Sequence, residues 1–219
     1  LYKRAQKIVT PLPFVSESSS LINFRDKVTW IGSGINLANY PFPAPLPTGT
    51  NESFEVLYLG AHGPINDLMN VLNAFERIQS QGYSNVKLTL VGHGVEKEVL
   101  IREAGRMNLS NVIFADAIPR NKVPEVVASA DACLFSLKKA AIFNYGINPN
   151  KLADYLGGGK PIISAADVRN NVVQEVGCGI AVPAGDPKKL ADAILKLYGM
   201  PAGDRAAMGY KGRKNAEEF

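Results

Sequence analysis

Residues 54–60 read Phe-Glu-Val-Leu-Tyr-Leu-Gly, an apolar run that ends at a glycine. A continuous apolar run of this length is typical of a strand that is covered on both faces, as in a parallel sheet. Similar runs recur along the chain, at residues 86–91, 111–115, 131–136, 161–164 and 179–182. Residues 54–59 are therefore predicted to be the first strand of a buried sheet.

The segments between these runs have the period of a helix. After the first run, apolar residues recur three or four positions apart, at Ile65, Leu68, Met69, Leu72 and Phe75. Residues 190–197 and 205–219 predict two closing helices. Alternating strands and helices specify a parallel sheet with right-handed crossovers and helices on both faces. The expected fold class is α/β, a doubly wound Rossmann-like parallel sheet of about six strands.

Composition and charge exclude several classes of protein. The chain has 219 residues, and a hydrophobic content of 46% argues against a disordered protein. No apolar run approaches the roughly 18 residues of a spanning helix, which argues against a membrane protein. The net charge of +4 is compatible with an acidic ligand, and leaves peripheral membrane association of the full-length protein open. No nucleic-acid partner is expected. Cys133 and Cys178 fit no metal spacing and are expected to be buried thiols. Reduced thiols are typical of a cytoplasmic protein, and the protein could lie at the inner face of the membrane.

Residues 1–50 differ from the rest of the chain. Residues 5–10 and 27–31 predict two strands, and four prolines within residues 41–47 predict an extended linker. The chain begins at Leu1 without an initiator methionine or a signal peptide, so it is expected to be a piece of a longer protein. We divide it into a tail with a linker, residues 1–50, and a ligand-binding domain, residues 51–219. In the alternative reading, the tail is an integral edge of that domain.

Glycines follow the first two predicted strands, where a doubly wound sheet binds its ligands. The first loop contains Gly60, His62 and Gly63, and the second contains Gly92. Such glycines let the backbone approach a diphosphate closely. His62 and His93 are the only histidines, and no third ligand with suitable spacing accompanies them. We therefore expect loop or phosphate contacts here, and no metal site.

Three other kinds of site do not fit these loops. Residues 92–94 read Gly-His-Gly but lack the third glycine and the later acid of a dinucleotide site. No serine lies on the Gly-x-Ser-x-Gly turn of a hydrolase. A binding module of the flavodoxin or response-regulator type needs an acidic cluster at the end of the first strand, where Gly60 and Ala61 stand.

Residues 144–161 read Asn-Tyr-Gly-Ile-Asn-Pro-Asn-Lys-Leu-Ala-Asp-Tyr-Leu-Gly-Gly-Gly-Lys-Pro. Asn148 is predicted to cap a helix that begins at Pro149. The free backbone N–H groups of its first turn, at Asn150 and Lys151, form a potential anion site, and Asp154 one turn later could hold a polyol. In the alternative reading, Asp154 is an ordinary surface carboxylate of an αβ unit.

The run Pro-Asn-Lys-Leu-x-Asp-Tyr-Leu-x-x-Gly-Lys-Pro resembles the donor-site helix of the family 4 (group 1) retaining glycosyltransferases, which have the two-domain GT-B fold. Residues 90–94 and 130–131 resemble further motifs of that family. The resemblance implies that Asp154 grips the nucleotide ribose and that main-chain groups around Ile118 read the base. It aligns Gly146 with a glutamate that touches the transferred sugar, and here the sequence departs from the family.

The resemblance also implies the reaction: transfer of a sugar from a nucleotide sugar, expected to be UDP-linked, to a hydroxyl acceptor with retention. Surface polysaccharide or glycolipid biosynthesis is the expected setting. The acceptor, a glycan or lipid-linked glycan, would bind the missing N-terminal domain, whose tail would be residues 1–50. The chain alone is therefore expected to be inactive, with no catalytic residue assignable, no cofactor and no metal. A UDP-sugar epimerase of the same fold and a non-catalytic nucleotide-binding module are the alternatives.

The cation that neutralises the departing diphosphate is missing from its usual place. Members of the family put an arginine and a lysine on the loop and helix after the first strand, but this chain has neither between residues 28 and 76. Lys138, after the fourth strand, is the first candidate to replace them, and Lys151 is the second. Because Gly146 carries no carboxylate, the sugar hydroxyl is expected to be absent or substituted, or else to meet the backbone of residues 145–147.

Overall fold

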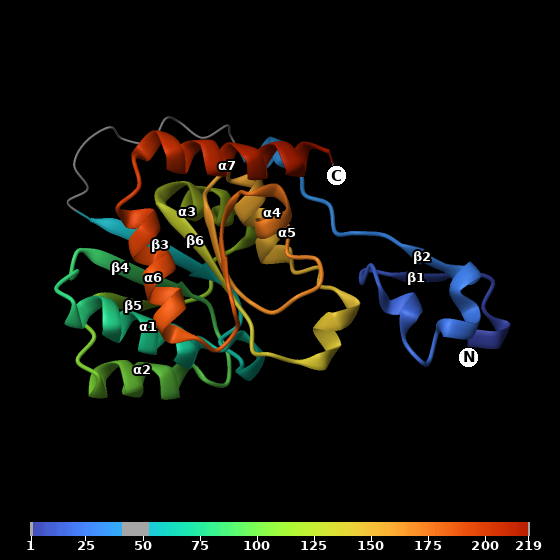
Figure 1. Cartoon of the computed structure of the whole chain (residues 1–219), viewed down its shortest axis with the longest axis horizontal. Coiled ribbons are helices and arrows are strands. Elements are labelled where there is room, and N and C mark those ends of the chain that lie inside the picture. Colours follow the sequence, from blue (N-terminus) through green and yellow to red (C-terminus); the bar gives the residue numbers. More distant parts are fainter. Residues whose placement is uncertain (1, 41–52, 219) are drawn as a thin grey trace.

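The computed structural model describes residues 2–40 and 53–218. The predicted proline-rich linker, residues 41–47, and the predicted boundary at residue 50 lie outside the described residues. The structure consists of a sheet flanked by helices and, beside it, a small unit formed by the N-terminal residues (Figure 1).

Six parallel strands form the sheet, in the order β5-β4-β3-β6-β7-β8. Their bounds are β3 (Phe54–Leu59), β4 (Val86–Val91), β5 (Val112–Ala115), β6 (Ala132–Ser136), β7 (Ile162–Ala165) and β8 (Gly179–Val182). Each bound differs by no more than one residue from the one predicted. The α/β class and the doubly wound parallel sheet of six strands are therefore confirmed.

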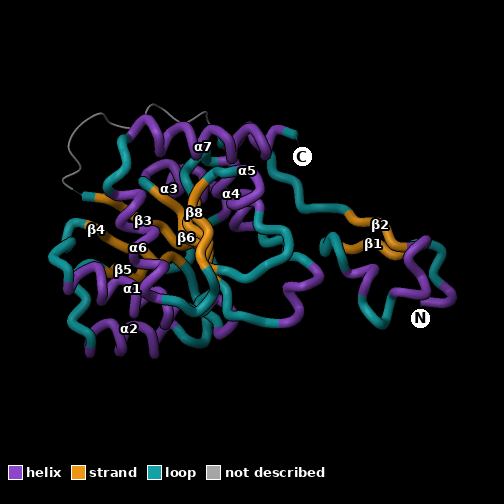
Figure 2. Tube along the Cα trace, in the orientation of Figure 1, coloured by secondary structure: helices purple, strands orange, loops and turns teal. Residues whose placement is uncertain are grey.

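Helices cover both faces of this sheet, as Figure 2 shows. The described helices are α1 (Leu68–Ser80), α2 (Lys97–Arg106), α3 (Val123–Ser129), α4 (Asn150–Gly157), α5 (Val172–Val176), α6 (Pro187–Tyr198) and α7 (Ala202–Glu217). One hydrophobic cluster joins α1, α2 and α6 to the sheet, and a second joins α3, α4, α5 and α7. Among residues 2–40 and 53–218, no helix combines the length and the apolar character needed to cross a membrane.

Strand β3 illustrates why the apolar runs are continuous. Val56 and Tyr58 belong to the first cluster, whereas Leu57 and Leu59 belong to the second. Successive side chains of a strand point to opposite faces, so a sheet covered on both sides needs apolar residues at every position. The two cysteines, both free, are buried in the second cluster, as predicted.

The N-terminal unit, residues 2–40, is built from short elements. They are η1 (Tyr2–Arg4), β1 (Ile8–Thr10), η2 (Val15–Glu17), η3 (Ile22–Lys27), β2 (Val28–Trp30) and η4 (Leu37–Asn39), and the two strands pair in parallel. This unit contacts the loops that precede α4 and α5. The Phe14 N–H donates to the Tyr145 carbonyl (3.1 Å), and Arg169 pairs with Glu17 (2.6 Å).

The predicted start of the central helix is wrong by one residue. Helix α4 begins at Asn150, and Pro149 occupies the cap position in an extended conformation, so Asn148 does not cap the helix. The Asn148 amide instead donates to the Ser33 hydroxyl of the N-terminal unit (3.0 Å). The side chain of Asn148 thus takes part in a tertiary contact and not in a cap of the helix.

Helix α7 lies directly against the end of α4, and glycines make this approach possible. A Cβ atom at Gly209 would lie 1.9 Å from the carbonyl oxygen of Gly159, which is backbone and has little room to move. One turn later, a Cβ atom at Gly212 would lie 3.1 Å from the Leu156 side chain. The backbone of α7 therefore packs on α4 without intervening side chains.

We expect Gly209→Ala to lower the free energy of unfolding by about 1–3 kcal/mol, because the new methyl group forces α7 away from α4. Gly203→Ala, on the same helix, is the matched control, since nothing lies within 4 Å of its new Cβ atom. That control should leave stability unchanged or raise it by up to about 1 kcal/mol. Urea denaturation followed by circular dichroism would measure both variants, and equal effects would contradict this account of the helix contact.

Candidate functional site

The candidate site lies where the strand order reverses, between β3 and β6. Connections from these two strands leave toward opposite faces of the sheet, and ligands of doubly wound proteins bind at this point. The loop after β3 and the loop after β6 are tied together, since the Lys138 N–H donates to the Ile65 carbonyl (2.8 Å). Helix α4 follows the β6 loop and supplies two charged side chains, Lys151 and Asp154, about one turn apart.

Lys151 extends from α4 to the loop after β3. Its ammonium group donates to the Tyr58 hydroxyl (2.8 Å) and to the Asn66 side-chain oxygen (2.9 Å), and it lies 4.3 Å from the centre of the Tyr58 ring. The Tyr58 hydroxyl and the Asn66 amide both donate in turn to the Ala61 carbonyl. This network fixes the lysine side chain and leaves one of its three N–H donors for a ligand.

The ammonium group of Lys151 has only neutral partners. No carboxylate forms an ion pair with it among the described residues. Burial lowers its pKa to about 8, because the charged form is poorly solvated there. Gly60 makes room for this side chain, since a Cβ atom there would lie 3.0 Å from the lysine Cε. The arrangement favours an anion, which would supply the missing counter-charge.

The glycines of the first two loops have different roles. Gly92, with φ of +151°, would place a Cβ atom 1.9 Å from the Gly60 carbonyl oxygen, so only glycine allows the two loops to meet. The Gly60 N–H donates to the Val91 carbonyl across the same contact. Gly63 is different: its φ is −121°, and nothing lies within 4 Å of a Cβ atom placed there. The open space beside Gly63 is compatible with the predicted approach of a ligand.

His62 lies beneath the loop and does not project from it. Its side chain is 0% exposed and sits between the rings of Tyr58 and Phe114, with centroids 6.1 and 6.2 Å away. Neither ring nitrogen has a hydrogen-bond partner among the described residues. Burial lowers the pKa of His62 to about 4, so the imidazole is neutral near pH 7. Within residues 2–40 and 53–218, no group of three side chains is arranged to hold a metal ion.

Asp154 is a buried carboxylate, so its interpretation as an ordinary surface residue is wrong. Its side chain is 6% exposed, and each oxygen has a partner. Oδ1 accepts a hydrogen bond from the Tyr40 hydroxyl (2.6 Å), and Oδ2 pairs with Arg120 Nη1 (2.6 Å). Arg120 follows the loop after β5, where half-buried Ile118 packs against the second hydrophobic cluster. Arg120 thus links Asp154 to the loop that is expected to read the base.

Lys138 and Asn150 are exposed. Lys138 lies near Asp67, whose pKa is raised by burial and partly lowered again by this lysine. Asn150 is the first residue of α4, at the helix start that was predicted to bind an anion. Both candidate cations therefore lie beside the loop after β3, and Lys151 is the one whose ammonium group is fixed there by hydrogen bonds, to a tyrosine of β3 and an asparagine of the loop.

Gly146 leaves no space for the glutamate that is found at this position in the glycosyltransferase family that the sequence resembles. Its φ is +86°, and a Cβ atom would lie 2.6 Å from Pro13 Cγ and 3.0 Å from Asn170 Oδ1. The neighbouring backbone is also occupied: the Tyr145 carbonyl accepts from Phe14, and the Ile147 N–H and carbonyl both bond the Asn170 amide. The expected backbone contacts of residues 145–147 with a sugar are thus replaced by contacts within the protein.

Four residues that shape this site were not identified from the sequence: Tyr40, Tyr58, Asn66 and Arg120. Their contacts with α4 join residues that are 34 to 114 positions apart, a distance at which periodicity carries no information. Tyr58 offered one signal, since a tyrosine within a buried strand needs a partner for its hydroxyl at the end of that strand.

Comparison with known proteins identifies relatives of this architecture. A family model described as glycosyl transferases group 1 matches residues 53–200. The chain is similar to Anabaena HepE in complex with UDP and glucose, with a TM-score of 0.77 and 16% identity, over 99% of this chain and 60% of HepE. It is also similar to a mutant of S. aureus TarM in complex with fondaparinux, α-GlcNAc-glycerol and UDP, with a TM-score of 0.76 and 14% identity, over 99% of this chain and 41% of TarM.

A third similar structure is the C-terminal domain of a glycosyl transferase group 1 family protein, LpcC, from Francisella tularensis. It has a TM-score of 0.66 and 13% identity, over 84% of this chain and 97% of that domain. At such identities the likeness shows the fold alone. The chain spans 60% of HepE and 41% of TarM, and no curated protein sequence matches it.

The pKa of Lys151 predicts how anion binding depends on pH. The ammonium form predominates below about pH 8 in the free chain, and a bound anion would raise this pKa further, so affinity for UDP, used as the anionic probe, should change little below about pH 8 and fall as the pH rises above it. Lys151→Arg, whose charge does not titrate in this range, should remove this dependence, and Lys138→Met should retain it. Titration calorimetry would measure each affinity. The same decline in Lys151→Arg as in the parent would show that another group is responsible.

Proposed function

The chain belongs to the glycosyl transferases of group 1, and from this premise we propose that it binds a nucleotide sugar as the donor half of a GT-B enzyme. The donor is UDP-linked in this proposal. Structures of the similar proteins HepE and TarM were determined with UDP, which supports the choice of base. The match to a transferase family also favours transfer over the epimerase and over a non-catalytic module.

The observation that carries the proposal is the pair of charges on α4. Lys151 reaches the loop after β3, its partners in the described part of the chain are all neutral, and it suits a diphosphate. Asp154 is held by Arg120 close to the loop after β5, and it suits ribose hydroxyls. A carboxylate has about four acceptor sites, and the two bonds seen here leave two for a ligand. One helix thus offers a cation for the diphosphate and, about one turn later, a carboxylate for the ribose of a nucleoside diphosphate.

The proposed reaction breaks the bond between the anomeric carbon and the diphosphate oxygen, and the electron pair leaves with the diphosphate. The acceptor hydroxyl forms the new bond on the same face of the sugar, and its proton passes to the departing phosphate oxygen. Charge that develops on this oxygen is stabilised by Lys151 and by the free N–H groups at the start of α4. No base is required from the described residues.

The tight packing at Gly146 bears on the donor sugar. No carboxylate fits there, and Asn170 occupies the neighbouring backbone. In this proposal the sugar hydroxyl that the family's glutamate holds is absent, acylated or replaced by an amino group. The acceptor is a glycan or lipid-linked glycan that binds the other half of the enzyme, in surface polysaccharide or glycolipid biosynthesis at the cytoplasmic side of the membrane.

Binding of UDP by the chain itself is the first test. We expect UDP to bind weakly and in preference to both GDP and NAD. Asp154→Ala should weaken UDP by roughly 1.5–3 kcal/mol, since charge-assisted hydrogen bonds to the ribose are lost. Asp154→Asn, which can still accept from Tyr40, should weaken UDP as well and separates loss of charge from loss of packing. Titration calorimetry would measure the affinities, with circular dichroism as the check on folding.

Three results would contradict the proposed nucleotide site. The chain could fail to bind any nucleotide at millimolar protein concentration, it could clearly prefer NAD to UDP, or both Asp154 variants could fold and bind UDP as tightly as the parent chain.

Catalysis is the second test. The chain alone should release no UDP from UDP-sugars, because positioning of donor against acceptor, which can supply about 7–11 kcal/mol, requires the other half of the cleft. A longer protein that contains this chain should release UDP with a substituted or deoxygenated sugar in a panel of UDP-sugars. Transfer by the chain alone would contradict the two-domain proposal, and activity of the longer protein with UDP-glucose only would contradict the inference from Gly146.

A further inference from the structure

Tyr40 lies at the end of the N-terminal unit, yet its surroundings belong to the nucleotide-binding domain. Its side chain is 3% exposed and lies against α4. A Cβ atom at Gly157 would be 3.4 Å from Tyr40 Cγ and 2.8 Å from the Ile35 side chain. Glycine at position 157 therefore lets residues 35–40 lie directly on the end of this helix, and a larger residue there would require at least the Ile35 side chain to move.

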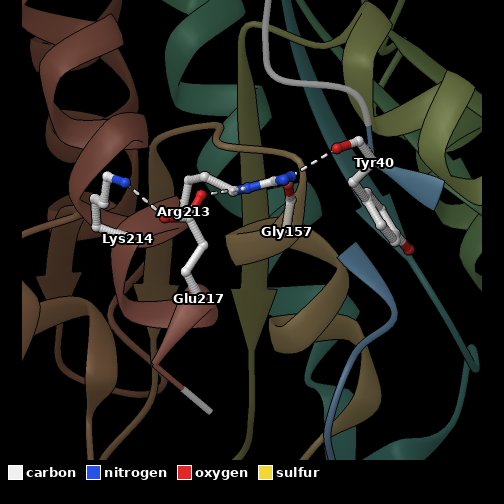
Figure 3. A network of polar contacts seen from close by, with 5 residues as sticks. All are labelled: Tyr40, Gly157, Arg213, Lys214 and Glu217. Carbon is white, nitrogen blue, oxygen red and sulfur yellow. Dashed lines mark hydrogen bonds and ion pairs between the residues drawn. The ribbon is translucent and has the colours of Figure 1, made fainter. Parts of the chain in front are cut away.

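Both polar ends of Tyr40 are bonded to the domain. Its carbonyl oxygen accepts from Arg213 Nη1 (2.7 Å), and the same nitrogen donates to the Gly157 carbonyl (2.7 Å). Arg213 is itself buried and is held through its Nε by Glu217 (3.3 Å). Figure 3 shows this network, with the phenol of Tyr40 directed away from Arg213. That phenol donates to Asp154 Oδ1 (2.6 Å).

Tyr40 therefore connects the last turn of α4 to a carboxylate in the middle of the same helix. Burial and the hydrogen bond to Asp154 raise the pKa of the Tyr40 phenol well above its usual range, so it remains a proton donor at any working pH. Arg120, the other partner of Asp154, is 65% exposed and has no comparable support from the core. Of the two contacts, the tyrosine is the rigid one, and it sets the direction of the carboxylate.

We propose that Tyr40 is a positioning residue, which orients the Asp154 carboxylate for the ribose hydroxyls of the donor and is itself anchored by Arg213 to α4 and α7. The inference rests on the proposed function, because Asp154 is taken to be the ribose contact. An aspartate is one methylene shorter than a glutamate and has less freedom to find the hydroxyls. A fixed orientation of the carboxylate therefore contributes more to ribose binding by this aspartate than it would for a longer glutamate.

The test compares Tyr40→Phe with the parent chain, using UDP and 2′,3′-dideoxyuridine diphosphate, which lacks both ribose hydroxyls. The parent should prefer UDP. Tyr40→Phe should weaken UDP about tenfold and change the affinity for the dideoxy compound by less than about twofold, so the preference shrinks. Tyr198→Phe is the matched control: it removes a hydroxyl bonded to Asn85 on the opposite face of the sheet, and both affinities should stay unchanged.

A second variant covers the case in which Tyr40→Phe is unstable. Arg213→Lys retains the charge but has a single nitrogen, so it cannot keep both the Nη1 bonds to the Tyr40 and Gly157 carbonyls and the Nε bond to Glu217, and it should reduce the preference for UDP in the same direction. If either folded variant weakens both ligands equally, or keeps the full preference, the positioning role is overturned. If the parent itself shows no preference, the ribose does not lie on Asp154, and the proposed function fails together with this inference.

Discussion

The buried carboxylate of Asp154 is the constraint on which the site depends. Moving a charge out of water is unfavourable unless partners replace the lost hydration. Here the partners come from two distant segments, since Tyr40 precedes the sheet and Arg120 follows β5. The carboxylate thereby fixes the relative positions of the N-terminal segment, α4 and the loop after β5. Removing either partner would leave the charge less well compensated, so these three segments are coupled energetically.

Lys151 places a second, opposite requirement on the same helix. Its ammonium group is desolvated, and its partners within residues 2–40 and 53–218 are a phenol, an amide oxygen and aromatic rings, without a counter-charge. This arrangement opposes the charged form, as the lowered pKa of about 8 indicates. An incoming anion would reverse the balance, because it supplies the missing charge in a place where water competes poorly. Lys151 of α4 therefore provides a cation beside the loop after β3. That loop and the part of α1 before Arg77 contain no lysine or arginine of their own.

Much of the fold could be predicted from the sequence, because strands that are covered on both faces must be apolar throughout, and this is a local signal. Within the site, Lys151 and Asp154 were recognisable because they share one helix. Tyr40 and Arg213 were not, since they meet 173 positions apart through a carbonyl that any residue possesses. Asn148 failed as a cap because the helix begins one residue later than predicted, which puts Pro149 at the cap position. The burial of His62 was equally hidden, because a histidine between glycines in a loop has every local feature of an exposed residue.

The contacts of residues 35–40 show to which part of the molecule this segment belongs. Ile35 and Leu37 pack against the second hydrophobic cluster, and Tyr40 is buried with both polar ends bonded. By contrast, the unit before them is joined to the domain through half-buried contacts, such as the backbone bond from Phe14 to Tyr145, and through the exposed pair of Glu17 with Arg169, and exposed ion pairs contribute little to stability. The buried contacts therefore dominate, and residues 35–40 are held to the domain that contains the six-stranded sheet. Gly32 and Gly34 precede this segment, and a Cβ atom at Gly34 would meet nothing within 4 Å. Any change in orientation between the two parts would consequently be taken up before Ile35, and the position of Tyr40 on Asp154 would be preserved through it.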